Sequence, residues 1–107
     1  MFDWSPDAAH RRIDGWQEAL ERRAARAQQL AAAVAQLQAE GTDPDRVVRA
    51  TVDSRGRLLG LTIDDRADRW STSQTAAAVM AAVSAAQDAV AEQARSIIVE
   101  AGPGDVA

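Results

Sequence analysis

The stretch that decides the fold runs from Val48 to Asp65 and reads VRATVDSRGRLLGLTIDD. Its first half alternates apolar with polar residues, as in a strand with one buried face, and the apolar positions are Val48, Ala50 and Val52. Gly56 then supplies the positive φ that a tight turn demands. The second half alternates again, with Leu59, Leu61 and Ile63 on one side and Leu58, Gly60 and Thr62 on the other. These patterns predict a β-hairpin over residues 46–64.

A long helix is predicted before the hairpin, over residues 6–40. Ser5 is a suitable N-cap, and Pro6 fits the first helical position. Gly41 closes the helix, and the run from Gly41 to Asp45 has the composition of a turn. At a rise of 1.5 Å per residue this helix would be about 50 Å long, so it must project from a domain of this size or pair with another helix.

A second long helix is predicted after the hairpin, over residues 72–101. The run from Ser71 to Gln74 matches a capping box, and Gly102 ends the helix, leaving residues 102–107 as a mobile tail. The expected fold class is α+β, in one domain over residues 1–107, with the order long helix, hairpin, long helix. A third strand would have to come from residues 42–46, which are poor strand formers.

Apolar residues recur at heptad spacing along both predicted helices. This spacing is typical of a coiled coil or a partner groove, but it also occurs where a helix covers its own sheet. The residues predicted to pack between helices or between copies are Ile13, Trp16, Leu20, Leu30, Val34, Leu37, Met80, Val83, Val90 and Ile97. Of the 50 hydrophobic residues, 25 are alanine, so one copy buries little apolar surface and a homodimer is expected.

Composition excludes several classes of function. The 107 residues include no cysteine and a single histidine, His10, which rules out disulfides, thiolate metal sites and histidine pairs. No apolar run approaches the ~18 residues that cross a bilayer, and the first residues do not form a signal-peptide pattern, so a cytoplasmic location is expected. We expect no catalytic site, metal, cofactor or small-molecule substrate, because the sequence has no base, nucleophile and orienting group at a recognisable spacing. The clustered Asp64, Asp65 and Asp68 lie where they would cap a helix.

The hairpin sequence and the capped, alanine-rich helix after it resemble the YbaB/EbfC family of small nucleoid-associated proteins, over nearly the whole chain. The most specific part is the alternating strand, the turn at Gly56 and the strand ending Leu61-Thr-Ile-Asp64. The resemblance implies a homodimer of α-β-β-β-α protomers whose sheets meet at the centre and whose helices project like the arms of tweezers. It also implies binding to duplex DNA, in the nucleoid, without a catalytic site.

Arginines supply the chemistry that DNA binding needs. When the first helix is drawn at 100° per residue, one arc of about 120° holds Arg11, Arg12, Arg22, Arg23 and Arg26. Arg49 and Arg55 of the hairpin would add to this surface, and two-fold symmetry would double it. Such a surface would contact phosphates with little base specificity, and its affinity would fall steeply with salt.

The same residues allow another interpretation. Asp7 to Arg11 and Glu18 to Arg22 have the (i, i+4) spacing of ion pairs, which would make the arc an ordinary solvated helix face. The net charge of −4 opposes nonspecific attraction to DNA or to an anionic membrane, and no membrane partner is expected. The alternative function is a protein-interaction or accessory module, for example beside a specialised secretion system, that binds a protein partner and no DNA.

Overall fold

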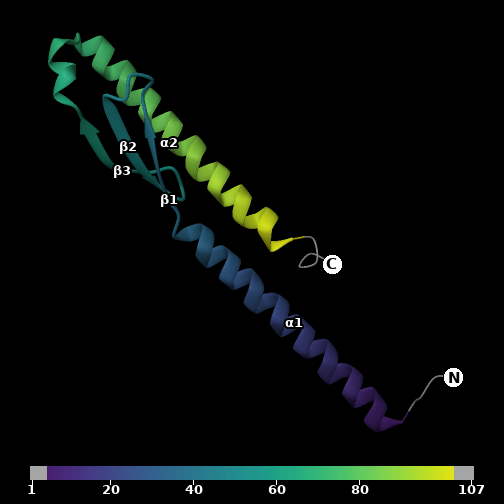
Figure 1. Ribbon diagram of the computed structural model, residues 1–107. Helices are drawn as coiled ribbons and strands as arrows, with labels where there is room; N and C mark the ends of the chain where they lie inside the picture. Colours follow the sequence, from purple (N-terminus) through teal and green to yellow (C-terminus); the bar gives the residue numbers. More distant parts are fainter. Residues whose placement is uncertain (1–4, 103–107) are drawn as a thin grey trace.

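The computed structural model describes residues 5–102. Its elements follow in the order α1 (Pro6–Ala35), β1 (Gln38–Thr42), β2 (Val48–Asp53), β3 (Leu58–Ile63), the 3-10 helix η1 (Asp65–Arg69) and α2 (Thr72–Ala101). The molecule is a rod with extents of 82 × 20 × 15 Å, in which α2 lies along a three-stranded antiparallel sheet and α1 continues beyond it (Figure 1). The predicted α+β class and order of elements are confirmed. Residues 103–107 of the predicted tail lie outside the described residues.

Helix α1 begins as the sequence predicts and ends earlier. The Ser5 hydroxyl oxygen accepts a hydrogen bond from the Ala8 N–H at 3.2 Å, and Pro6 is the first helical residue. The helix stops at Ala35, so the prediction that it runs to residue 40 and is closed by Gly41 is wrong. The residues that follow have good helix propensity, but pairing with a neighbouring strand overrides it.

Strand β1 contains residues 38–40 of the predicted helix and the first two residues of the predicted turn, Gly41 and Thr42. It pairs antiparallel with β2, so that Ala39 lies opposite Val52 and Gly41 lies opposite Ala50. The third strand that the sequence left open does form, but it lies mostly before the expected residues 42–46, of which only Thr42 belongs to β1. Ala39 is buried and both of its neighbours are exposed, which is the alternation of a half-buried strand.

Gly41 brings β1 against the backbone of α2. A Cβ atom at this position would lie 2.6 Å from the carbonyl carbon of Ala85 and 2.7 Å from the carbonyl oxygen of Ala82. These distances are shorter than any van der Waals contact, so a side chain at residue 41 would push the strand away from the helix. Glycine is therefore required here by packing and not by helix termination.

The core between the sheet and α2 is made of small side chains. Its buried residues are Ala39, Val47, Val48, Ala50, Val52, Ala78, Ala82, Ala86 and Val90. Helix α2 turns toward the sheet a stripe of alanines spaced by four residues, and the stripe ends at Val90. Val83 and Ile97 are half-buried, as are Leu30, Val34 and Leu37. Met80 is 70% exposed, and its packing against a second copy stays a prediction.

The hairpin turn is held by one glycine and one aspartate. Gly56 has a φ of +82°, which confirms the positive φ predicted for it. The Asp53 carboxylate accepts hydrogen bonds from the N–H groups of Arg55 and Arg57, each at 2.9 Å. The Gln87 side chain of α2 donates to the Gly56 carbonyl at 3.0 Å, which ties the turn to the helix.

Strand β3 is the uncovered edge of the sheet. Helix α2 packs on β1 and β2, and the strand order β1-β2-β3 leaves β3 at the side (Figure 1). A bulge opposite Val52 inserts one extra residue into the register of β3. All six β3 residues are exposed, including Leu58 (44%), Leu59 (50%), Leu61 (39%) and Ile63 (44%). The protomer thus presents a strand edge that carries large apolar side chains.

The start of α2 is the predicted capping box. Ser71 Oγ accepts from the Gln74 N–H at 3.1 Å, and the Gln74 side-chain oxygen accepts from the Ser71 N–H at 2.8 Å. The helix ends at Gly102, as predicted, with a φ of +78°. Before α2, the Asp64 carboxylate caps η1 by accepting from the Arg66 N–H at 2.9 Å. The short helix η1 was not predicted from the sequence.

Replacing Gly41 by alanine is expected to destabilise the protein by about 1–3 kcal/mol, because strand and helix must separate to admit the methyl group. The matched control is Gly15→Ala in α1, where no atom lies within 4 Å of an added Cβ. That change removes a helix-weakening glycine and should stabilise the protein by up to about 1 kcal/mol. Urea denaturation followed by circular dichroism measures both, and a Gly41 variant as stable as the parent would contradict the close contact.

Candidate nucleic-acid interface

Helix α1 forms an arm that extends past the body, the body being the sheet together with α2. No residue of α1 is buried. The arm and the end of α2 enclose a groove of about 160 Å³ that is lined by Arg23, Arg26, Ala27, Leu30, Ile98, Ala101 and Gly102. The residues of α1 before this groove continue along the rod beyond α2 (Figure 1). The first half of the arm is therefore exposed around its circumference.

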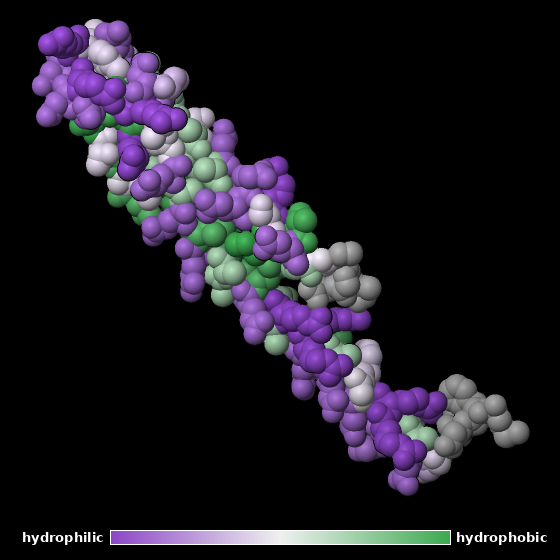
Figure 2. All heavy atoms as spheres, in the orientation of Figure 1, coloured by the Kyte–Doolittle hydropathy of each residue, from purple (hydrophilic) through white to green (hydrophobic). Residues whose placement is uncertain are grey.

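Three adjacent strips of different character run along the arm at 100° per residue. The predicted arginine arc lies on α1 and contains Arg11, Arg12, Arg22, Arg23 and Arg26. An acidic strip borders it on one side and contains Asp7, Asp14, Glu18 and Glu21. An apolar strip borders it on the other side, with Ile13, Trp16 and Leu20. All these side chains are exposed, and the arm is largely hydrophilic in the face that Figure 2 shows.

The two (i, i+4) ion pairs of the alternative interpretation are not seen in the described residues. Within residues 5–102, Asp7 makes no ion pair with Arg11, and Glu18 makes none with Arg22. Asp14 instead lies 3.7 Å from the His10 ring, and both of these side chains are exposed. Exposed pairs contribute little to stability, so sequence spacing alone does not fix them. The guanidinium groups of Arg11 and Arg22 are therefore available to an external anion.

The two hairpin arginines predicted to join this surface lie at different distances from the arm. Arg55 is in the β2–β3 turn, and the pairing of Gln38 with Asp53 puts this turn beside the junction of α1 and β1. Arg49 lies nearer the other end of β2, on the outer face of the sheet, 3.9 Å from the Glu40 carboxylate. The structure thus brings Arg55, but not Arg49, toward the arginine arc.

Two arginines that the sequence did not single out lie near Arg49. A hollow of about 230 Å³ at this end of the sheet is lined by Arg46, Arg49 and Thr62, among others. Arg46 has a φ of +58°, and the Arg66 guanidinium donates to the Arg46 carbonyl at 3.0 Å. The turn was visible in the sequence from Asp43 to Asp45, but its closure by a residue of η1 has no local signal.

The turn between β1 and β2 is held by a buried carboxylate. Asp43 is 2% exposed, and its Oδ1 accepts hydrogen bonds from the N–H groups of Val47 at 2.8 Å and Val48 at 2.7 Å. Its Oδ2 accepts from the Asp45 N–H at 3.1 Å. These bonds, that from Val48 foremost, lower the pKa of Asp43 below its ordinary value of 3.8.

Two further aspartates hold turns in the same way. The Arg57 N–H, and after it the Arg55 N–H, lower the pKa of Asp53, and the Arg66 N–H lowers the pKa of Asp64. These carboxylates serve the backbone, which confirms the capping role predicted for Asp64. Residues 5–102 contain no group of three or more potential ligands placed to hold a metal ion.

Comparison with known protein families gives a match over most of the chain. The sequence model of the YbaB/EbfC DNA-binding family matches residues 11–104. The chain belongs to this family. The resemblance carried by the hairpin and the capped helix is thereby confirmed, and so is the prediction of a protein without a catalytic site, because the YbaB/EbfC family is a non-catalytic DNA-binding family. A search of curated proteins finds no match.

The helices of this YbaB/EbfC family member were also compared with the length and apolar character that a membrane span needs. Over residues 5–102, neither long helix is apolar enough to cross a bilayer.

Acid is expected to destabilise the fold through these aspartates. Their lowered pKa values mean that the charged forms stabilise the fold above pH 3.8, and that this stabilisation is lost as the pH falls through the lowered values. Asp53→Asn keeps an oxygen acceptor for the turn but removes the charge, so its thermal midpoint should fall less steeply below about pH 4. Melting curves between neutral and strongly acidic pH measure this, with the exposed Asp88→Asn as control. An identical acid dependence in Asp53→Asn and the parent would contradict the assignment.

Proposed function

We propose that the protein binds duplex DNA as a homodimer, through phosphate contacts of the arginine arc on α1 and with little base specificity. The observation that carries this proposal is the arc itself, which lies on a projecting arm and includes Arg11 and Arg22 without the ion pairs that their spacing predicts. Membership of a DNA-binding family supports DNA as the partner and the nucleoid as the location.

The acidic total does not prevent this contact, because charge is distributed unevenly along the chain. Helix α1 carries five arginines against four acidic residues, whereas the chain as a whole has a net charge of −4. The centres of the acidic and arginine strips are about 110° apart around the arm, so a duplex that meets the arginines does not face the carboxylates. At physiological salt, exposed charges more than about 8 Å apart are largely screened.

The arginine arc is long enough to meet several phosphates. From Arg11 to Arg26 the helix rises about 22 Å at 1.5 Å per residue. Phosphates of one DNA strand repeat every ~3.4 Å along the duplex axis, so the arc runs past about six of them. Guanidinium groups bind phosphate oxygens as charged, bidentate hydrogen-bond donors, and they need not reach a base edge to do so. Backbone contact is the mode that this geometry favours.

Strand β3 supports the homodimer. The sheet order leaves one side of β3 without a partner strand in the described part of the chain, and its apolar side chains are exposed. Antiparallel pairing of β3 with β3 of a second copy would join the two sheets and cover Leu59, Leu61 and Ile63. The alanine-rich core buries little apolar surface, so burial at this edge would add substantially to the stability of each copy.

DNA binding is expected to depend on the arm. The triple variant Arg22→Gln, Arg23→Gln and Arg26→Gln should bind a labelled duplex at least about tenfold more weakly at low salt. Its plot of log affinity against log salt should also be shallower, by about 0.9 for each phosphate that the variant no longer neutralises. Fluorescence anisotropy titrations at low and moderate salt measure both quantities.

The matched control removes the same charge from the body, through Arg57→Gln, Arg69→Gln and Arg95→Gln. It should bind close to the parent, because these residues lie outside the arm. Equal weakening in the two triple variants would show that net charge governs binding and not the arginine arc. A parent that binds no duplex at low salt would overturn the proposed function.

The dimer is expected to depend on β3. Leu61→Lys places a charge at the strand edge, which opposes pairing with a second copy, so light scattering should give the mass of one chain for the variant and of two for the parent. Ser84→Lys adds the same charge on an exposed position of α2 and should leave the mass unchanged. A parent that is monomeric at micromolar concentration rejects the homodimer. A dimeric Leu61→Lys variant places the interface elsewhere.

The apolar strip of the arm favours a second candidate function, a protein-interaction module. Ile13 (52% exposed), Trp16 (66%) and Leu20 (42%) lie on the part of α1 that extends past α2. An exposed apolar strip at helical spacing is a surface onto which a partner helix can dock. The duplex titration separates the two functions, because the protein-interaction module, unlike the DNA-binding function, predicts that the parent binds no duplex at low salt.

A further inference from the structure

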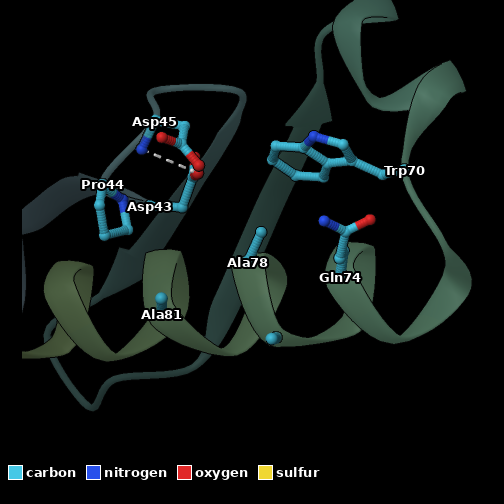
Figure 3. Close-up of a pocket in the computed structure, with 8 residues that line it drawn as sticks. Asp43, Pro44, Asp45, Trp70, Gln74, Ala78 and Ala81 are labelled. Carbon is cyan, nitrogen blue, oxygen red and sulfur yellow. Dashed lines mark hydrogen bonds between the residues drawn. The ribbon is translucent and has the colours of Figure 1, made fainter.

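A hollow of about 360 Å³ lies where the β1–β2 turn meets the first turns of α2. The turn contributes Asp43, Pro44 and Asp45 to one wall, and Trp70 stands on the other side (Figure 3). Its remaining lining is Gln74, Ala77, Ala78 and Ala81 of α2. The hollow is at the end of the body away from the α1–β1 junction, so the arm and the arginine arc do not contribute to it.

The turn side of this hollow is acidic. The buried Asp43 carboxylate receives three N–H groups, which satisfy its oxygens but supply no positive charge. Its pKa is lowered, chiefly by the Val48 N–H, so it is charged at neutral pH. The neighbouring Asp45 side chain is exposed at the rim. Among residues 5–102, no cation forms an ion pair with either carboxylate, so neither has a positively charged group in contact with it.

The opposite wall is aromatic and held in place. Trp70 is half-buried against the core, and its backbone N–H donates to the Ala67 carbonyl at 2.9 Å. The indole stands over Ala78 and Gln74, with the space between it and the turn open (Figure 3). The Gln74 side chain is fixed by the capping box, through its hydrogen bond from the Ser71 N–H. On the turn side, Asp45 is held through its backbone N–H, which donates to the Asp43 carboxylate, while its own side chain extends to the rim.

A planar cation matches this pair of walls. An indole face attracts a cation within about 6 Å of the ring, and a carboxylate accepts charged N–H donors strongly. A guanidinium group can stack on the ring and donate to a carboxylate at the same time, whereas an ammonium group is a compact, strongly hydrated charge that does not stack. Phosphate would be repelled by the aspartates, so the hollow is not an additional contact for DNA.

We propose that this hollow binds an arginine side chain of a protein partner, with the guanidinium group between the Trp70 indole and the Asp45 carboxylate. The alanines of α2 leave room beside them for the aliphatic part of the arginine side chain. The site does not depend on the arm, and DNA binding can fail or succeed without affecting it.

A chain with Trp4→Phe and Trp16→Phe keeps Trp70 as its one tryptophan, so its fluorescence reports on this hollow. The probe is N-acetyl-arginine methylamide, and the matched ligand is its citrulline analogue, which has the same shape without the charge. The arginine probe should change Trp70 fluorescence in a saturable way in the millimolar range. The citrulline analogue should bind at least about fivefold more weakly. Equal binding of the two ligands, or no saturable response to arginine, would overturn the proposal.

Asp45→Asn in the same single-tryptophan chain should weaken binding of the arginine probe by about three- to tenfold, because the charged acceptor is removed. Asp65→Asn makes the same change of charge on η1, outside the residues that line the hollow, and should leave the affinity unchanged. Unaltered affinity in Asp45→Asn, or equal weakening in the two variants, would show that the proposed carboxylate does not hold the guanidinium group.

The arginine side chain that enters the hollow has a second candidate source, which is another copy of this arginine-rich chain. Light scattering of the parent and of Asp45→Asn over a range of protein concentrations separates the two sources. Equal masses at every concentration support a separate protein partner. A parent that forms larger assemblies, with Asp45→Asn failing to form them, would assign the hollow to contacts between copies and overturn the proposed partner.

Discussion

The contact between β1 and the backbone of α2 at Gly41 governs the rest of the structure. Strand and helix approach this closely because residue 41 has no side chain and the facing stripe of α2 is alanine. A helix seated over β1 and β2 cannot also cover β3, so the large apolar side chains of the sheet lie outside while alanine and valine fill the core. This reverses the usual distribution of apolar residues, and apolar surface of this kind is stable in water when another molecule covers it.

Local chemistry made part of this fold predictable. The cap at Ser5, the turn at Gly56 and the capping box at Ser71 each depend on residues within a few positions of one another, so their spacing is visible in the sequence. The end of α1 is different, because residues 36–40 are good helix formers that become strand by pairing with β2. The buried alanine stripe of α2 was equally hidden, since alanine occurs on every face of that helix and no spacing stands out.

The candidate site also has features that the sequence predicts and features that it does not. The arginine arc follows from helix periodicity, which holds wherever a helix forms, so its members could be named from the sequence. The ion pairs could not, because solvent competes with exposed pairs and spacing does not decide the outcome. The hollow at Trp70 had no local signal at all, since Asp43 and Trp70 meet only after β1 and α2 have packed. Sequence periodicity locates surfaces on single elements, whereas sites between elements depend on tertiary contacts.

The elongated shape explains how an acidic chain can offer a basic surface. Net charge is a property of all 107 residues, but a phosphate group responds to charges within about one Debye length, ~8 Å at physiological salt. The rod is 82 Å long, so the arginines of the arm and the aspartates of the far hollow act on their surroundings independently. In a globular protein of this size the two would lie close enough to weaken each other. By fixing α2 over the first two strands, the Gly41 contact leaves α1 to extend as an arm, and this separation of charge follows from that packing.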